Sequence, residues 1–345
     1  MTLKSIADGL KPEWSPDGQK ITFHMKGSDG YYDVYTMNPD GSNQVCLTAD
    51  KPALPGRNIG CASWHPSGQY LIFTAEKDRH AGGSALSHPG IGFNCDIWLM
   101  TSDGKQSWRL TDLTTKMDLR DPTPVSAVLG PHFSNDGTKV SWSERIGPGG
   151  KWGEWALKLA DFVPVGNGGP RLENVRTYQT GSQHRYYESD DFSLDDSKLL
   201  FCGNIIAGQD ETEMDIYTLD LGSGQVQRLT SDGGWNETGH FSPDDSKIVW
   251  LSNSGYSADT ASGGKYWWEQ QRTDYWTMNA DGSAKTQLTY YNKPGTPDYL
   301  SVGGKRTMAE YATWSPDGTR LAGGLVIDNG GENTIDRITL IDLNR

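Results

Sequence analysis

The amino-acid sequence predicts an all-β fold, a six-bladed β-propeller of four-stranded antiparallel blades closed by the N-terminal strand. Successive aromatic anchors of a recurring turn motif are 49 to 73 residues apart, which accommodates a propeller blade of about 40 to 50 residues. The 42 glycines and 17 prolines supply turns, and no long segment has helical apolar spacing. The six copies of the motif are Trp14–Gly18, Trp64–Gly68, Phe133–Gly137, Phe192–Asp196, Phe241–Asp245 and Trp314–Gly318.

Each repeat is predicted to continue with further strands after its aromatic turn. In the first repeat these are 20–24, 33–37 and 44–48, and an Asp-Gly pair at 40–41 suits the positive φ angles of a hairpin turn. Equivalent strands are expected at 70–73 and 96–100, with a fourth strand that ends at 110–111; at 139–143, 154–159 and about 171–177; at 198–201, 215–219 and 226–230; at 247–250, 274–278 and 287–289; and at 320–326 and 338–343. The sixth repeat lacks a fourth strand, and residues 2–7 are predicted to supply it, because this closure leaves no open edge.

One pattern from end to end predicts a single propeller domain over residues 1–345. The blades are expected at about 11–50, 58–112, 129–178, 185–231, 235–291 and 309–345, the last with strand 2–7.

Composition and charge exclude several classes of partner. The net charge of -13, without a basic patch, disfavours nucleic acid and anionic membranes. No apolar segment suggests membrane insertion, and residues 1–10 lack the apolar core of a signal peptide. We therefore expect a cytoplasmic monomer, or a periplasmic or secreted one if a leader has been removed. Without C-x-x-C spacing, buried unpaired side chains are expected at Cys46, Cys61, Cys95 and Cys202.

Polar residues before the aromatic anchors are predicted to face the central channel, because the first strand of each blade lines it. The residues immediately before the anchors are Glu13, Ser63, His132, Asp191, His240 and Thr313. Two imidazoles and a carboxylate therefore converge from blades three, four and five. Further polar candidates for ligand binding a few positions upstream are His184, Arg185, Tyr187, Glu188, Asn236, Glu237, Glu310 and Tyr311.

Three interpretations of these channel residues remain open. A divalent metal ion (Ca, Mn or Zn) is the candidate cofactor, and its candidate ligands are His132, Asp191, His240 and His184. Alternatively, His132 or His240 and Tyr187 would be the base and acid of a β-elimination in a sugar chain. The third interpretation is that channel-facing polar groups bind only ordered water.

Two long inserts add candidate recognition residues. The blade-two insert, residues 79–94, contains His80 and His88 and would form either an exposed loop or a lid over the channel mouth. The blade-five insert contains Trp267, Trp268 and Arg272, and aromatic faces beside charged groups suit sugar or peptide ligands. Packing of that insert on its own blade is the alternative.

The repeats resemble those of the TolB-type β-propeller family. The resemblance rests on the Ser-Pro-Asp-Gly turn, the third strand of the Asp-Ile-Tyr type and the Leu-Thr end of each blade, and it covers essentially the whole chain. Similar repeats occur in the propellers of tricorn-like and prolyl-oligopeptidase-like proteases and in oligogalacturonate lyases, which hold a metal through His and Gln in the propeller centre. We expect the propeller without TolB's separate α/β domain. No G-x-S-x-G motif follows the last blade, so a peptidase is not expected.

The leading functional prediction is a binding propeller that uses the channel mouth and the inserts of blades two and five as its recognition face. Its partner would be a small molecule, an oligosaccharide or a protein. The alternative is a metal-assisted polysaccharide lyase or related carbohydrate-active enzyme with a site centred on His132 and His240.

Overall fold

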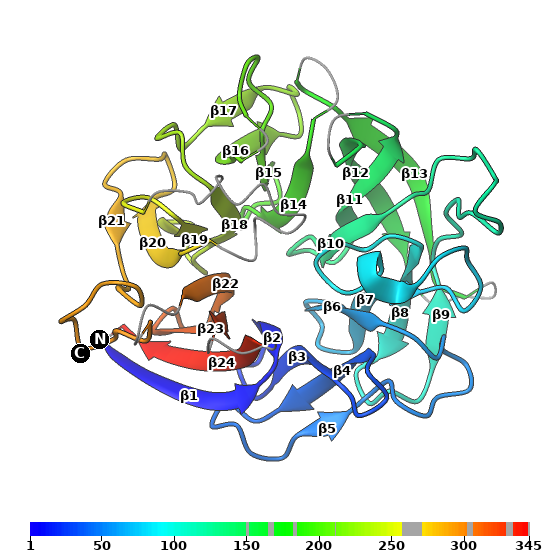
Figure 1. Cartoon of the computed structure of the whole chain (residues 1–345), viewed down its shortest axis with the longest axis horizontal. Helices are drawn as coiled ribbons and strands as arrows, with labels where there is room; N and C mark the ends of the chain where they lie inside the picture. Colours follow the sequence, from blue (N-terminus) through cyan, green and yellow to red (C-terminus); the bar gives the residue numbers. More distant parts are fainter. Residues whose placement is uncertain are drawn as a thin grey trace.

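Six four-stranded antiparallel sheets form a ring in the computed structural model (Figure 1). The structure describes residues 1–149, 152–164, 169–181, 185–210, 212–256, 271–301, 306–328 and 334–343. Within these ranges the one helix is a 3-10 turn at Ser84–Leu86. None of the described segments forms an apolar helix of membrane-spanning length. The prediction of an all-β, six-bladed propeller is confirmed.

In blades one to five the strands run outward from the channel in chain order, and in blade six β1 lies outside β24. Blades one to three consist of β2 (Leu10–Trp14), β3 (Ile21–Lys26), β4 (Tyr32–Met37) and β5 (Val45–Cys46); β6 (Ile59–Trp64), β7 (Tyr70–Glu76), β8 (Cys95–Thr101) and β9 (Ser107–Arg109); and β10 (Val128–Phe133), β11 (Lys139–Gly147), β12 (Glu154–Val163) and β13 (Arg171–Tyr178). Blades four to six consist of β14 (Tyr187–Phe192), β15 (Lys198–Gly203), β16 (Asp215–Asp220) and β17 (Val226–Arg228); β18 (Asn236–Phe241), β19 (Lys247–Ser252), β20 (Asp274–Asn279) and β21 (Thr286–Gln287); and β22 (Thr307–Trp314), β23 (Arg320–Asp328), β24 (Thr334–Asp342) and β1 (Thr2–Asp8).

The N-terminal strand closes the ring, as predicted. β1 pairs antiparallel with β24, from Thr2 opposite Asp342 to Asp8 opposite Arg337. Figure 1 shows the blue β1 along the outer edge of the red β24. The first and last parts of the chain therefore share one blade, and blade six has the same four strands as the others.

The recurring motif forms a tight turn between the first and second strands of each blade. In blade one, Ser15 Oγ donates to Asp17 Oδ1 (2.6 Å) and accepts from the Lys20 amide (2.8 Å). Gly18 takes a φ of 69°, a left-handed conformation that costs glycine little. Ser134, Ser193, Ser242 and Ser315 make the same bond to an Asp two residues later.

A second repeated bond joins the start of the third strand to the end of the fourth. Asp33 accepts a hydrogen bond from Thr48 Oγ1 (2.6 Å), and that hydroxyl accepts from the Val34 amide (3.0 Å). Equivalent Asp–Thr pairs are Asp96 with Thr111, Asp215 with Thr230, and Asp274 with Thr289. The pairing explains why the motifs Asp-Ile-Tyr and Leu-Thr recur at fixed places in the repeats.

The core consists of six apolar clusters, and each lies between two neighbouring blades. Between blades three and four, for example, Trp155 and Leu157 pack with Phe192 and Phe201, and all four are buried. Each sheet thus covers its apolar face with the next sheet. The four cysteines are free: Cys61, Cys95 and Cys202 are buried, and Cys46 is partly exposed.

Candidate functional site in the channel

A β-bulge in the innermost strand of every blade decides which residues face the channel. β2, β6, β10, β14, β18 and β22 each show a register shift against the next strand, just before the aromatic anchor. Four residues at the shift have positive φ: Lys11 (51°), Cys61 (52°), Gly130 (51°) and Thr238 (51°). Side chains alternate along a regular strand, and one extra residue reverses that alternation. Residues one and four positions before the anchor therefore share the channel side.

The residues one position before the anchors, together with Tyr311, form the layer that we call the histidine layer. The rings of His132 and His240 have centroids 5.8 Å apart, and Tyr311 stacks on His132 and meets His240 edge-on at 4.4 Å. All three are buried. Chain segments more than a hundred residues apart thus meet at the axis of the ring.

Hydrogen bonds fix His132 in one tautomer. Ser63 Oγ donates to Glu13 Oε1 (2.8 Å), so its contact with His132 Nδ1 (3.3 Å) uses the imidazole N–H as donor. His132 Nε2 then accepts from the Tyr311 hydroxyl (3.1 Å). Burial, with the nearby Lys11 and His240, lowers the pKa of His132 well below its usual range, so the ring is neutral.

His240 has a carboxylate on one side and an unfilled position on the other. Its Nδ1 lies 3.4 Å from Asp191 Oδ2, which also accepts from the Phe241 amide (3.0 Å). Its Nε2 is buried and has no hydrogen-bond partner among the described residues.

The residues four positions before the anchors form a second layer, nearer the strand starts. In blades four, five and six this position is Glu188, Glu237 and Glu310, which we call the acid layer. In blades one and three it is Leu10 and Leu129. The layer is therefore acidic on one half of the ring and apolar on the other.

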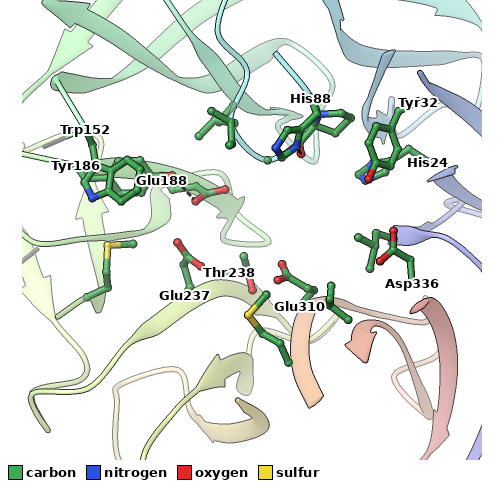
Figure 2. Close-up of a pocket in the computed structure, with 18 of the residues that line it drawn as sticks. His24, Tyr32, His88, Trp152, Tyr186, Glu188, Glu237, Thr238, Glu310 and Asp336 are labelled. Carbon is green, nitrogen blue, oxygen red and sulfur yellow. Dashed lines mark hydrogen bonds between the residues drawn. The ribbon is translucent and has the colours of Figure 1, made fainter. Parts of the chain in front are cut away.

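The acid layer faces a cavity of about 480 Å³, which we call the channel-mouth cavity. Figure 2 shows Glu188, Glu237 and Glu310 directed into it, with Asp336 across the space beside His24 and Tyr32. Its other walls include Trp152, Trp155, Tyr186, Met214, Trp235, Thr238, Met308 and residues 88–91 of the blade-two insert. The volume suits a small molecule or the end of a longer chain.

Burial raises the pKa of every carboxyl group in the acid layer. The pKa of Glu310 rises to about 8, first through burial and then through the charges of Glu188 and Asp336. Burial, followed by Glu188 and Glu310, raises the pKa of Glu237 well above its usual value. Burial also raises the pKa of Glu188, against the lowering effects of Lys11 and the Tyr186 hydroxyl. Without a cation the three groups disfavour simultaneous ionisation.

Aromatic donors orient two of these carboxylates. Tyr186 Oη donates to Glu188 Oε2 (2.9 Å), and Trp235 Nε1 donates to Glu237 Oε2 (3.0 Å). Each aromatic residue precedes its Glu by two positions, and in a strand such residues share one face. The Glu310 carboxylate has no hydrogen bond or ion pair with another residue that the structure describes.

The blade-two insert covers part of the cavity. Pro89 lies over Gly60 of β6, where an added Cβ would be 2.8 Å from Pro89 Cβ and closer still to Cγ. His88 faces Tyr32, with ring centroids 6.3 Å apart. His80 instead lies in a buried network: its Nε2 contacts Glu76 Oε1 at 2.7 Å. His88 thus lines the cavity, and His80 anchors the insert.

The comparisons with known proteins define the fold. No protein-family model matches the chain. TolB from Acinetobacter baumannii superposes with a TM-score of 0.55 at 16% identity, covering 93% of this chain and 64% of TolB. A TolB-type structure from Agrobacterium tumefaciens gives 0.53 at 17% identity, covering 87% and 81%. The chain has the fold of a TolB-type β-propeller.

An enzyme shares this propeller architecture. An oligogalacturonate lyase in complex with manganese superposes with a TM-score of 0.53 at 12% identity, covering 99% of this chain and 91% of the lyase. At such identities the similarity establishes the fold only. Because the chain spans 64% of the Acinetobacter TolB, that protein's function does not transfer with it.

Some of the residues predicted to line the channel do so in the structure, and others point away from it. His132, His240, Asp191 and Tyr311 meet in the histidine layer, and His88, Glu188, Glu237 and Glu310 line the channel-mouth cavity. Tyr187 and Asn236 point away: Tyr187 Oη accepts from the Gly181 amide (2.6 Å), and Asn236 bonds Asp232 and Trp250. Arg185 and Arg272 are described but are not among the residues that line the cavity. His184, Trp267 and Trp268 lie outside the described residues.

Sequence reasoning missed the aromatic wall of the cavity, together with Lys11 and Thr238. The motif aromatic-x-Glu, present as Tyr186-Tyr187-Glu188 and Trp235-Asn236-Glu237, is the signal that identifies this wall. Lys11 Nζ lies 4.6 Å from the centroid of the Tyr311 ring.

Proposed function

We propose that the protein is a binding propeller that takes a small ligand, or the end of a longer one, into the channel-mouth cavity. The observation that carries the proposal is the cavity of about 480 Å³, into which the Glu310 carboxylate projects without a hydrogen bond or ion pair to another described residue (Figure 2). Thr238 lines the same cavity, and its buried hydroxyl has no hydrogen-bond partner among the described residues. A ligand in the cavity would supply the Glu310 carboxylate with a partner.

The test fills the cavity and asks whether binding disappears. Saturation-transfer NMR with a library of soluble fragments is expected to find ligands of the wild-type protein. Met308→Trp places a larger side chain on the cavity wall and should abolish their binding. Met117→Trp, at an exposed loop position, is the matched control and should retain it. Equal binding by Met308→Trp and the wild type would refute the proposal.

A metal-assisted lyase acting on an acidic polysaccharide is the second candidate function. The contact between His132 Nε2 and Tyr311 Oη favours it, because an imidazole and a phenol in contact suit base and acid roles. Tyr311 would take the acid role for which the sequence suggested Tyr187. A divalent ion fits Glu188, Cys202 and Glu237, whose ligand atoms lie within 4.8 Å of one another. When bound, it would polarise a substrate carboxylate.

Two assays distinguish the candidates. A lyase should generate an unsaturated product that absorbs ultraviolet light during incubation with uronate oligomers. His132→Ala and His240→Ala should each abolish that signal, and untagged protein should contain a stoichiometric divalent metal. If neither product nor metal is found and fragment binding is retained, the lyase function is refuted and the binding function is supported.

A further inference from the structure

We propose that the channel-mouth cavity selects an organic cation: an ammonium or guanidinium group on an apolar or aromatic stem. This inference rests on the proposed binding function and specifies the ligand class. Glu188, Glu237 and Glu310 occupy the same repeat position on three consecutive innermost strands and face one space (Figure 2). Asp336 of β24 faces the same cavity from the other side.

More carboxyl groups than basic groups line the cavity. Among the described residues that line it there is no Lys or Arg, whereas four are acidic. The two histidines do not compensate, because burial lowers the pKa of both, that of His24 to about 3. Lys11, which is not among the lining residues, lies over the Tyr311 ring, and its charge also acts on Glu188. An incoming cation would therefore face no competing positive group on the walls.

Two polar groups that line the cavity have no hydrogen-bond partner among the described residues. The Glu310 carboxylate makes no hydrogen bond or ion pair to another described residue, and the buried hydroxyl of Thr238 has no hydrogen-bond partner in the described parts of the chain. A carboxylate accepts and a hydroxyl can accept, so both suit a ligand rich in N–H donors. Ammonium and guanidinium groups are such donors.

The remaining walls suit the organic stem of the ligand. Trp152, Trp155, Tyr186 and Trp235 line the cavity from blades three to five, and Leu10 and Leu129 add aliphatic side chains from blades one and three. Aromatic faces attract cations and also cover apolar stems. A site that combines carboxylates with aromatic and aliphatic walls discriminates an organic cation from a hydrated inorganic one.

A bare metal ion is the competing occupant of the acid layer. Of the three grouped ligand atoms, the thiol of Cys202 belongs to a fully buried residue that does not line the cavity. Glu188 and Glu237 each already accept a hydrogen bond from an aromatic side chain. The cavity of about 480 Å³ also far exceeds the volume of one ion.

Isothermal titration calorimetry with three probes of similar shape tests the charge preference. The probes are phenethylammonium, 2-phenylethanol and 3-phenylpropanoate. We expect the ammonium to bind about tenfold more tightly than the alcohol, and the carboxylate to bind most weakly. Equal affinities, or tightest binding of the carboxylate, would overturn the inference. If Met308→Trp abolishes binding of the alcohol or carboxylate in that case, the proposed binding function still stands.

Carboxyl-to-amide variants test the assignment to the acid layer. Glu237→Gln and Glu310→Gln keep the shape of a protonated carboxyl, so both should fold. Each should weaken phenethylammonium binding about tenfold and leave the alcohol nearly unchanged. Glu173→Gln, on the exposed outer strand β13, is the control and should change neither affinity. Unchanged ammonium affinity in both cavity variants would overturn the inference. Displacement of phenethylammonium by Mn²⁺ or Zn²⁺ that requires Cys202 would also overturn it.

Discussion

Replacing Glu310 by Gln should stabilise the ligand-free protein, and increasingly so as the pH rises. The folded structure raises the pKa of Glu310 from 4.5 to about 8, mainly by burial. A raised carboxyl pKa means that the group's contribution to stability is complete below pH 4.5 and is lost as the pH rises toward 8. Gln cannot ionise, so the variant escapes that loss.

The size of the stability gain follows from the pKa shift of Glu310. For a single group, ionisation of the unfolded chain at pH 7, which the folded protein resists, would cost about 3 kcal/mol of folding free energy. Glu310 is partly exposed, so solvent screening reduces this to roughly 1 to 2 kcal/mol. Its neighbours titrate with it, and the variant also relieves their repulsion. The titratable or charged groups that face the cavity or lie next to it are Glu188, Glu237, Asp336, Asp190, Lys11, His24, His88, Tyr32, Tyr186 and Cys202.

Urea unfolding at pH 5, 7 and 8.5, followed by tryptophan fluorescence, measures the prediction. The gain of Glu310→Gln over the wild type should be small at pH 5 and reach roughly 1 to 2 kcal/mol at pH 7 and above. Glu173→Gln, which removes an exposed carboxylate, should stay within about 0.5 kcal/mol of the wild type at each pH. A gain that does not grow with pH, or a less stable Glu310→Gln variant, would refute the reasoning.

Three further changes test other parts of the structure. Gly60→Ala places a methyl group against Pro89 and should cost about 1 to 3 kcal/mol in urea unfolding; an unchanged stability would mean that the insert does not pack there. Glu76→Gln weakens a fully buried carboxylate's bonds to Arg57, His80 and other donors, and should lower stability by about 3 kcal/mol, measured by thermal unfolding. Deleting residues 1–8 exposes the edge of β24, so gel filtration should show more association than for the full chain; an unchanged oligomeric state and an unchanged melting temperature would contradict closure by β1.

The repeat pattern was sufficient to predict the ring and its closure. A turn such as Trp14–Gly18 encodes its own geometry through local Ser–Asp bonds, so six copies define six blades. The missing fourth strand of blade six predicted the pairing of β1 with β24. Such features depend on residues close in sequence or on counting strands, and both are visible without coordinates.

The bulges were not predictable, and they decide the site. Without a bulge, Tyr187 and Asn236, five positions before their anchors, would face the channel. The extra residue reverses the alternation, so Tyr186 and Trp235 face it instead. Thr238 adopts a positive φ that could not be predicted from a threonine, whereas a glycine at this position would have suggested it. Local sequence therefore predicted which strands line the channel but not which of their faces.

A crystal structure of the protein with phenethylammonium bound tests the central claim most directly. The account predicts the ammonium nitrogen within hydrogen-bonding distance of Glu310 and of Glu188 or Glu237, with the phenyl ring against Trp235 or Tyr186. A probe bound elsewhere, or bound in the cavity with its nitrogen turned toward Leu10 and Leu129, would contradict it.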